Sequence, residues 1–343
     1  MSKKILITGI AGQDGYFLTK QLLERGYSIH GLLRPNSPTK LGSLNNLESH
    51  EIEQLILHEG NVTSKDFIDE LIRFSQFDEV YHLAAQSSVA HSIRNPRGTI
   101  ETNVLGITNI ATAIRDQSSK TRLLFAGSSE MFGSLTDGRQ TETTATYPQS
   151  PYGLTKEMGF NLIKTYRKHY GIWAATAILF NHESEFRGDQ FVTTKIIKSA
   201  VQIAHDKEGV LSLGNIHVKR DWGYAEDYVK GLLLMMDQAE PDDYVFATGQ
   251  LHSVKAFVDS AFKQVGITLI WSGSGLDETA RNSKNDQLVV RIDKRFYRPG
   301  DIAGTCGQAS KAKETLGWSP ETPLDTVISK MIQHHQKLRS LEG

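Results

Sequence analysis

Four polar side chains of this chain could move protons on and off an alcohol: Ser128, Glu130, Tyr152 and Lys156. Tyr152 and Lys156 are spaced so that a helix would carry both on one face. We expect the lysine ammonium to lower the pKa of Tyr152 towards neutrality, which would make the phenol a general base while hydride leaves the carbon. Glu130 adds a second base, and two bases predict two proton transfers. An ordinary surface helix is the alternative for an isolated Tyr–Lys pair.

The N-terminal segment predicts a loop that binds the phosphates of a dinucleotide. An apolar run of strand length precedes Gly9, Gly12 and Gly15, and an amphipathic helical pattern follows. Glycine permits the tight turn and the close approach of the backbone to a pyrophosphate, and a helix N-terminus attracts anions. The spacing is Gly-x-x-Gly-x-x-Gly, and a purely structural glycine-rich turn is the alternative.

A cation follows the second apolar run, where dinucleotide-binding folds place an acidic residue against the adenosine ribose. Arg34 suits a 2′-phosphate instead, and this favours NADP over NAD. Lys40 is a second candidate cation in the same loop. A solvated loop arginine is the alternative interpretation.

Strand and helix patterns alternate through the first half, which predicts an α/β fold: a Rossmann-like, doubly wound parallel sheet with helices on both faces. We expect residues 1–180 to bind NADP. Residues 181–343 should form a smaller mixed α/β substrate-binding region, with a soft, interleaved boundary. The expected strands are Lys4–Thr8, Ser28–Leu33, Leu55–His58, Glu79–Ala84, Arg122–Ala126 and Ala174–Phe180, and the expected helices are Gly15–Arg25, Ser64–Phe74, Thr99–Arg115 and Pro151–Tyr170.

The candidate residues follow strands, and ligands of such folds bind beyond the carboxyl ends of the strands. We therefore expect one site at that edge of the sheet. Pro151 suits the first turn of the helix that carries Tyr152 and Lys156. The residues expected at this edge are Gly9, Arg34, Asn61, Ala84, Ala85 and Ser128 to Glu130.

Composition limits the possible partners. The chain has 343 residues and a formal net charge of -1, so we expect neither nucleic acid nor an anionic membrane as a partner. The single cysteine, Cys306, fits a reducing cytoplasm, and no apolar run is long enough to span a membrane. The histidines, including His182, show no metal-ligand spacing, so we expect no metal and interpret them as packing or surface groups.

Together these motifs resemble the extended short-chain dehydrogenase/reductase superfamily. The closer resemblance is to GDP-mannose 4,6-dehydratases, and it spans nearly the whole chain. Its most specific parts are Phe180 to Ser184 and Lys219 to Gly223. The other matching segments are Thr8 to Gly15, Tyr147 to Gly153, Ile178 to Phe180, Leu211 to Asn215, Ala247 to Gly249, His252 to Val254 and Tyr297 to Pro299.

The resemblance implies a lyase that ends each turnover with its nicotinamide as it began. Tyr152, helped by Lys156 and Ser128, would take the O4 proton as the C4 hydride passes to NADP. Glu130 would then remove the C5 proton and protonate the C6 hydroxyl, which leaves as water before hydride returns to C6. The implied cofactor contacts are Gly9, Gly12, Gln13, Asp14, Gly15, Arg34, Asn61, Val62, Leu83, Ala84, Ala85, Ser87, Tyr152 and Lys156.

The resemblance also places the GDP-sugar. Arg220 and Arg281 suit the diphosphate because a guanidinium can fork onto two oxygens, and Lys195 could contact a phosphate or the base. Exposed ion pairs are the alternative for these three cations. The implied substrate contacts are Ser87, Glu130, Asn181, Val192, Lys195, Leu213, Gly214, Arg220 and Arg281.

Several positions depart from the family pattern, and in this comparison the catalytic set survives while the rim of the substrate site changes. They fit a relative that acts on a modified sugar, such as a GDP-manno-heptose. The departures also leave open whether the chain forms the family's homotetramer or a homodimer. They are Ser128 for Thr, Arg34-Pro35 for paired arginines, Asn61 for Asp, Glu185 and Phe186 in the Asn-His-Glu-Ser run, and Asp301 with Ala303 for an acidic pair.

Two other functions remain open. An NADPH-dependent reductase or epimerase acting on a GDP-4-keto-6-deoxy sugar would need Tyr152 and Lys156 but not Glu130. A redox-sensing binding module with an inactive site would need none of the four candidate catalytic residues.

Overall fold

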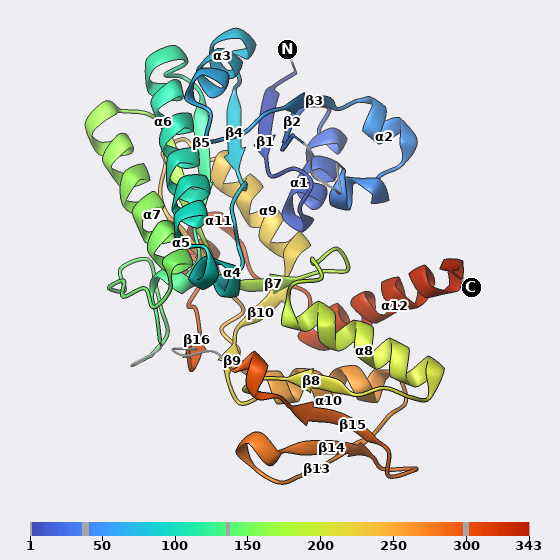
Figure 1. Cartoon of the computed structure of the whole chain (residues 1–343). Coiled ribbons are helices and arrows are strands. Elements are labelled where there is room, and N and C mark those ends of the chain that lie inside the picture. Colours follow the sequence, from blue (N-terminus) through green and yellow to red (C-terminus); the bar gives the residue numbers. More distant parts are fainter. Residues whose placement is uncertain (1, 36–40, 135–137, 298–301, 343) are drawn as a thin grey trace.

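The computed structural model describes residues 2–35, 41–134, 138–297 and 302–342. Its centre is a seven-stranded sheet in the order β11-β6-β5-β4-β1-β2-β3, in which every neighbouring pair is parallel (Figure 1). This confirms the predicted Rossmann-like fold. The strands are β1 Lys4–Thr8, β2 Ser28–Leu33, β3 Ile56–Glu59, β4 Glu79–His82, β5 Arg122–Ala126, β6 Ala174–Leu179 and β11 Tyr244–Phe246.

Helices cover both faces of this sheet, and each layer buries one hydrophobic cluster. On one face α1 (Gln13–Glu24) packs beside α9 (Ala225–Met236). On the other face α3 (Lys65–Ser75), α6 (Gly106–Gln117) and α7 (Pro151–Tyr170) lie together. Because both faces are covered, the strands read as nearly continuous apolar runs, and that explains why the sequence predicted them well.

One expected helix is interrupted. Instead of a single helix over Thr99–Arg115, the chain forms α5 (Pro96–Ile100), a π-helical turn η2 (Glu101–Leu105) and then α6. The helix starts early because Pro96 occupies the first turn and the Asn95 side chain accepts a hydrogen bond from the Gly98 N–H. Apolar periodicity alone does not report a π turn.

Most short strands of the second half, and the helices that pack against them, lie below the main sheet in Figure 1, whereas α9 covers the main sheet beside α1. Strand β11 of the second half also joins the main sheet beside β6, so the two halves interleave. The boundary at residue 180 stays a prediction. These strands are β7 Asn181–Glu183, β8 Leu211–Leu213, β9 Lys219–Arg220, β10 Trp222–Tyr224, β12 His252–Ser253, β13 Leu269–Ser272, β14 Thr279–Asn282, β15 Leu288–Ile292 and β16 Gly304–Thr305.

The remaining helices connect these layers. In the second half α8 (Val192–Asp206) packs against both α10 (Val254–Gln264) and the C-terminal α12 (Leu324–Glu342). Over the described ranges, no helix is long and apolar enough to cross a bilayer. The short helices are η1 Gly42–Asn46, α2 Ser49–Glu53, α4 Val89–Arg94, η3 Ser129–Met131, η4 Gly275–Asp277, η5 Lys294–Phe296 and α11 Ser310–Leu316.

Candidate active site

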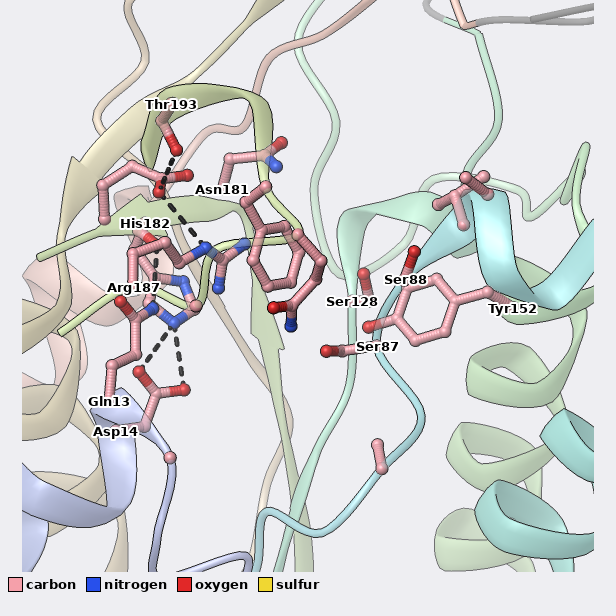
Figure 2. A pocket seen from close by; sticks show the side chains of 18 of the residues that line it. Gln13, Asp14, Ser87, Ser88, Ser128, Tyr152, Asn181, His182, Arg187 and Thr193 are labelled. Carbon is pink, nitrogen blue, oxygen red and sulfur yellow. Dashed lines mark hydrogen bonds and ion pairs between the residues drawn. The ribbon is translucent and has the colours of Figure 1, made fainter. Parts of the chain in front are cut away.

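A cavity of about 1540 Å³ opens at the carboxyl ends of the central strands, and both halves of the chain line it. In Figure 2, Ser87, Ser88, Ser128 and Tyr152 lie on one side of this cavity, and Asn181, His182 and Arg187 lie on the other. The cavity brings together every predicted site residue except Arg281. These are Gly9, Gly12, Gln13, Asp14, Gly15, Arg34, Asn61, Val62, Leu83, Ala84, Ala85, Ser87, Ser128, Glu130, Tyr152, Lys156, Asn181, Val192, Lys195, Leu213, Gly214 and Arg220.

The glycine loop has a shape that only glycine permits at two positions. Gly9 has φ +77°, and a Cβ atom there would lie 2.7 Å from the backbone nitrogen of Ala84. A Cβ atom on Gly15 would lie 2.3 Å from the carbonyl oxygen of Ile10. Gly12 precedes α1 and supplies no side-chain cap, so the first N–H groups of this helix remain available to a ligand. The loop therefore fits the phosphates of a dinucleotide.

The strand ends behind this loop are held together by a buried histidine. The Thr8 hydroxyl lies 2.8 Å from Nδ1 of His82, and it also accepts a hydrogen bond from the Ala84 N–H at 3.3 Å. Burial lowers the pKa of His82 to about 3, so this imidazole is neutral. Thr8 and His82 thus join the ends of β1 and β4, which carry the predicted cofactor contacts.

Two further predicted cofactor contacts follow β2 and β3. Arg34 is exposed, and Asn61 accepts a hydrogen bond on Oδ1 from the Thr63 N–H at 3.1 Å. Both residues line the cavity. Lys40, the second candidate cation, lies outside the described residues.

Tyr152 and Lys156 lie in the first turns of α7, as expected. Ser150 caps this helix by accepting a hydrogen bond from the Gly153 N–H at 3.0 Å, and Pro151 occupies the first turn. Both Tyr152 and Lys156 are buried and line the cavity. The spacing of four residues therefore places them on one face of the helix.

The predicted effect of Lys156 on Tyr152 is wrong in this structure. Burial raises the pKa of Tyr152 to about 12, against a lowering contribution from the hydrogen bond with Ser128. The Lys156 ammonium donates to the carbonyl oxygen of Ala126 at 2.7 Å, and burial lowers its own pKa to about 8. Desolvation is the largest cause of both shifts, because both groups are buried in a low-dielectric layer.

Glu130 lies beside the start of α7. A Cβ atom on Gly153 would lie 2.5 Å from the Glu130 carbonyl oxygen, so glycine permits this close approach. The Glu130 N–H donates to the Ser128 hydroxyl at 3.3 Å, and the Glu130 charge raises the pKa of Tyr152, as expected of a nearby carboxylate. A hydroxyl, a phenol and a carboxylate thus share one wall of the cavity.

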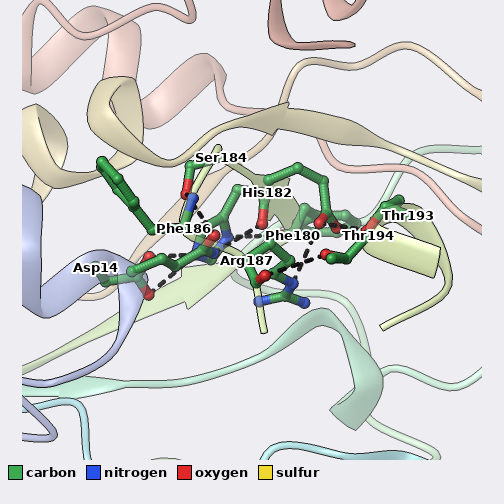
Figure 3. Close-up of polar contacts among 10 residues, drawn as sticks. Asp14, Phe180, His182, Ser184, Phe186, Arg187, Thr193 and Thr194 are labelled. Carbon is green, nitrogen blue, oxygen red and sulfur yellow. Dashed lines mark hydrogen bonds and ion pairs between the residues drawn. The ribbon is translucent and has the colours of Figure 1, made fainter. Parts of the chain in front are cut away.

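A buried polar seam joins the glycine loop to the second half of the chain (Figure 3). The Gln13 amide donates to the His182 carbonyl oxygen at 2.9 Å and accepts from the Ser184 hydroxyl at 2.9 Å. Both Asp14 carboxylate oxygens lie 3.0 Å from Nε2 of His182. Burial opposes both charges, but the pair outweighs it, so the pKa of His182 is raised and that of Asp14 is lowered.

The sequence interpretation missed this role of His182, which is an ion-pair partner as well as a packing group. It also missed Arg187, which lines the cavity and contacts Glu183 and the ring of Phe191. The signal was present, because both residues belong to the run that begins at Asn181. The spacing of the histidines serves only as a pattern for metal ligands, and such a pattern does not reveal an ion pair with a distant carboxylate. Among the residues that the structure describes, no group of three or more His, Cys, Asp or Glu side chains could hold a metal ion.

The two departures in this run make packing contacts. The Phe186 ring lies 4.3 Å from that of Tyr16, centroid to centroid, and 5.5 Å from that of His334 on α12. The Tyr224 hydroxyl donates to the Glu185 carboxylate at 3.2 Å. Phe186 also lines the cavity, so this departure alters both the packing and the wall.

Two of the three predicted substrate cations line the cavity. Nη1 of Arg220 donates to the carbonyl oxygen of Ile302 at 2.8 Å, which orients the guanidinium. The Lys195 ammonium donates to the Ser212 carbonyl oxygen at 2.6 Å and lies 3.6 Å from the centroid of the Phe296 ring. Arg220 thus fits the predicted anion contact, whereas Lys195 already contacts a carbonyl and a ring.

The third predicted cation does not lie in the cavity. Arg281 is on β14, and its Nη1 donates to the Asp286 carbonyl oxygen at 2.6 Å and lies 3.4 Å from the Asp286 carboxylate. Its side chain is 46% exposed. This is the exposed ion pair that the sequence left open as the alternative. Arg298, Pro299 and Asp301 lie outside the described residues.

Comparisons with known proteins agree with this geometry. A family model described as GDP-mannose 4,6 dehydratase matches residues 6–331. A GDP-mannose 4,6-dehydratase of Yersinia enterocolitica is 39% identical, with 96% of this chain and 93% of the relative covered. One of Vibrio cholerae is 37% identical, with 98% and 95% covered, and one of Cricetulus griseus is 37% identical, with 96% and 91% covered.

Solved structures share the fold at lower identity. A UDP-glucuronic acid 4-epimerase of Bacillus cereus, solved with UDP-glucuronic acid and NAD, has a TM-score of 0.81 at 22% identity and covers 98% of this chain and 99% of its own. A dTDP-glucose 4,6-dehydratase of Bacillus anthracis, solved with NAD, has a TM-score of 0.80 at 19% identity, with 99% and 98% covered. At these identities the likeness supports the fold alone.

Proposed function

This chain belongs to the GDP-mannose 4,6-dehydratase family, and we propose that it converts GDP-mannose to the GDP-4-keto-6-deoxy sugar by loss of water. The observation that carries the proposal is the placement of two bases, Tyr152 and Glu130, in one cavity beside the glycine loop, where both lie close to the Ser128 hydroxyl. Residues of both halves of the chain line this cavity, so it could hold a substrate against a bound dinucleotide.

We propose NADP as the cofactor. The glycine loop would hold its pyrophosphate, and Arg34 would contact its 2′-phosphate. Arg34 supports this choice because it is an exposed cation at the carboxyl end of β2 and lines the cavity. When bound, the nicotinamide would accept hydride from C4 and return it to C6.

The residues of the chain would move the protons. Tyr152 would take the O4 proton during oxidation of C4, with the Ser128 hydroxyl stabilising the phenolate by a hydrogen bond. The resulting ketone acidifies the C5 hydrogen. Glu130 would remove that proton and give one to the C6 hydroxyl, which leaves as water. As hydride returns to C6, the proton that Tyr152 took from O4 would pass to C5, so that both bases end the cycle as they began.

A reductase or epimerase that acts on a ready-made keto sugar is the second candidate. It would use Tyr152 and Lys156 and would have no need for Glu130. The position of Glu130 beside Tyr152 therefore favours the dehydratase. A GDP-manno-heptose also remains a candidate substrate, because Phe186 changes the cavity wall.

Glu130→Gln tests this function, because it keeps the shape of the side chain and removes the base. Positioned bases contribute about 10²–10⁴ in rate. We expect the variant to accumulate NADPH and a 4-keto hexose that retains its 6-hydroxyl, and mass spectrometry would show no loss of water. Tyr152→Phe is the matched control and should block NADPH formation itself.

Release of the 6-deoxy product by Glu130→Gln at nearly the parental rate would refute the two-base mechanism. The same mass-spectrometric assay of the parental protein, with GDP-mannose and GDP-manno-heptose in parallel, would identify the substrate as the sugar that loses water.

We also propose that the chain forms a homo-oligomer. Four large apolar side chains are 40–46% exposed on the adjacent segments α5, η2 and α7: Ile100, Leu105, Leu154 and Met158. Neighbouring exposed apolar groups of this kind often mark an interface between subunits. Sedimentation would distinguish a dimer from a tetramer.

The cytoplasmic location stays a prediction.

A further inference from the structure

Arg187 presents a charge to the cavity and is held from two sides. It lies on the loop between β7 and α8, and its guanidinium carbon is 3.5 Å from the centroid of the Phe191 ring. Its Nε is 3.2 Å from Oε2 of Glu183, an ion pair without the alignment of a hydrogen bond. The Arg187 side chain is 17% exposed, so little of it can move into solvent.

Glu183 is itself fixed. Its side chain is 2% exposed, and the Thr193 hydroxyl donates to the same Oε2 atom at 2.7 Å. The backbone of Arg187 is held as well, because its N–H donates to the Ser184 carbonyl oxygen at 3.1 Å. A carboxylate this deeply buried is costly to keep unless it has a charged partner. Glu183 therefore restrains the direction of the Arg187 side chain, which Figure 3 shows near Thr193.

Tyr152 and Arg187 lie on opposite sides of the cavity (Figure 2). The charged groups around the phenol oppose one another: Glu130 and Asp14 raise its pKa, and Arg187 lowers it. Lys156, on the same helix, lies 5.8 Å from the centroid of the Tyr152 ring and donates to the Ala126 carbonyl oxygen. Arg187 is thus a cation on the opposite wall whose direction the fold sets.

We propose that Glu183 is a positioning residue that aims the Arg187 guanidinium across the cavity at Tyr152, so that Arg187 favours the phenolate of this base. The proposal rests on the proposed function only for the role of Tyr152 as a base. The electrostatic claim concerns the protein alone and can be tested without substrate or cofactor.

The test is a ¹⁹F NMR titration of a fluorinated tyrosine placed at position 152, because ring fluorine lowers the phenol pKa into an accessible range. Arg187→Met and Glu183→Gln should each raise this pKa by about 0.3 to 1 unit, less than the one to three units of a charge in direct contact. Arg187→Lys keeps the charge and should stay near the parent. Lys198→Met removes an exposed cation of α8 and should cause no shift.

The sign for Glu183→Gln separates positioning from a direct effect. Loss of a negative charge acting directly on Tyr152 would lower the phenol pKa, whereas loss of positioning raises it. An unchanged pKa in Arg187→Met would overturn the proposal, and a rise in Arg187→Met without one in Glu183→Gln would overturn the role of Glu183. Circular dichroism would verify that each variant is folded. Neither failure touches the dehydratase assignment, which depends on the Glu130→Gln product.

Discussion

The two sides of the cavity are built in different ways. The side proposed to bind the cofactor, called the cofactor side below, stands on the carboxyl ends of β1, β2, β4 and β5, strands of four to six residues that are nearly all buried. The side proposed to bind the sugar nucleotide, called the substrate side below, stands on fragments such as β7, of three residues, and β9, of two. Regular buried strands position the residues of the cofactor side, whereas specific contacts between distant segments position those of the substrate side.

Asp221 shows what such a contact does. This side chain is completely buried between β9 and β10. It accepts hydrogen bonds from the N–H groups of Thr248 and Gly249, both at 2.8 Å, and of Gly307 at 3.2 Å. Three segments far apart in sequence therefore meet at one carboxylate. Substrate-side geometry thus depends on a few polar contacts, whereas cofactor-side geometry depends on a repeated backbone pattern.

The largest expected effect tests that dependence directly. Asp221→Ala leaves three backbone donors without their acceptor, and each buried unpaired donor costs about 1–3 kcal/mol. We expect the free energy of unfolding to fall by about 3 kcal/mol or more, with GDP-sugar binding lost before cofactor binding. Urea denaturation followed by circular dichroism, together with calorimetric titration of each ligand, would measure both effects.

Asp242→Ala is the control for Asp221→Ala. Asp242 is 51% exposed and pairs with Lys311 at the surface, so its loss should change stability by less than about 1 kcal/mol. Equal losses in the two variants would mean that the substrate side does not depend on Asp221, and the contrast between the two sides would fail.

The same contrast explains how far the sequence alone could reach. β1, β2 and β5 have the predicted bounds, because buried parallel strands leave apolar runs that adjacent glycines and helices delimit. The sequence also placed Ser128, Glu130, Tyr152 and Lys156 in one cavity. It could not show that Lys156 donates to Ala126 or that His182 pairs with Asp14. Those facts depend on desolvation and on contacts between residues far apart in the chain.

A cofactor-side test comes next in size. Arg34→Ala should weaken binding of NADP by roughly ten- to hundredfold and leave that of NAD nearly unchanged, because a charge-assisted hydrogen bond contributes about 1.5–3 kcal/mol. Fluorescence titration with both cofactors would measure this. A similar loss for NAD and NADP would show that Arg34 supports the loop and does not recognise the 2′-phosphate.

A substrate-side test should have a smaller effect. Arg220→Met should raise the Michaelis constant for the GDP-sugar by roughly tenfold, about 1.4 kcal/mol, and leave NADP affinity unchanged. Because Arg220 also donates to the Ile302 carbonyl oxygen, the thermal midpoint must be measured alongside. Arg220→Lys keeps the charge and separates the two roles. An unchanged Michaelis constant would leave Arg220 as a structural residue only.

The smallest expected effect decides between the sequence and the structure at Arg281. The family resemblance predicts a diphosphate contact, whereas the structure places Arg281 outside the cavity, paired with Asp286 in an exposed position. Exposed ion pairs contribute about 0–1 kcal/mol, so Arg281→Ala should change the Michaelis constant by less than about twofold and stability only slightly. Steady-state kinetics would measure the Michaelis constants of Arg281→Ala and Arg220→Met in parallel, so that the second variant serves as the reference for the loss of a substrate contact. A rise as large as that of Arg220→Met would restore the sequence prediction. Such a result would also require the sheet that contains β13, β14 and β15 to move towards the cavity when substrate binds. In its present position on β14, Arg281 does not reach the cavity.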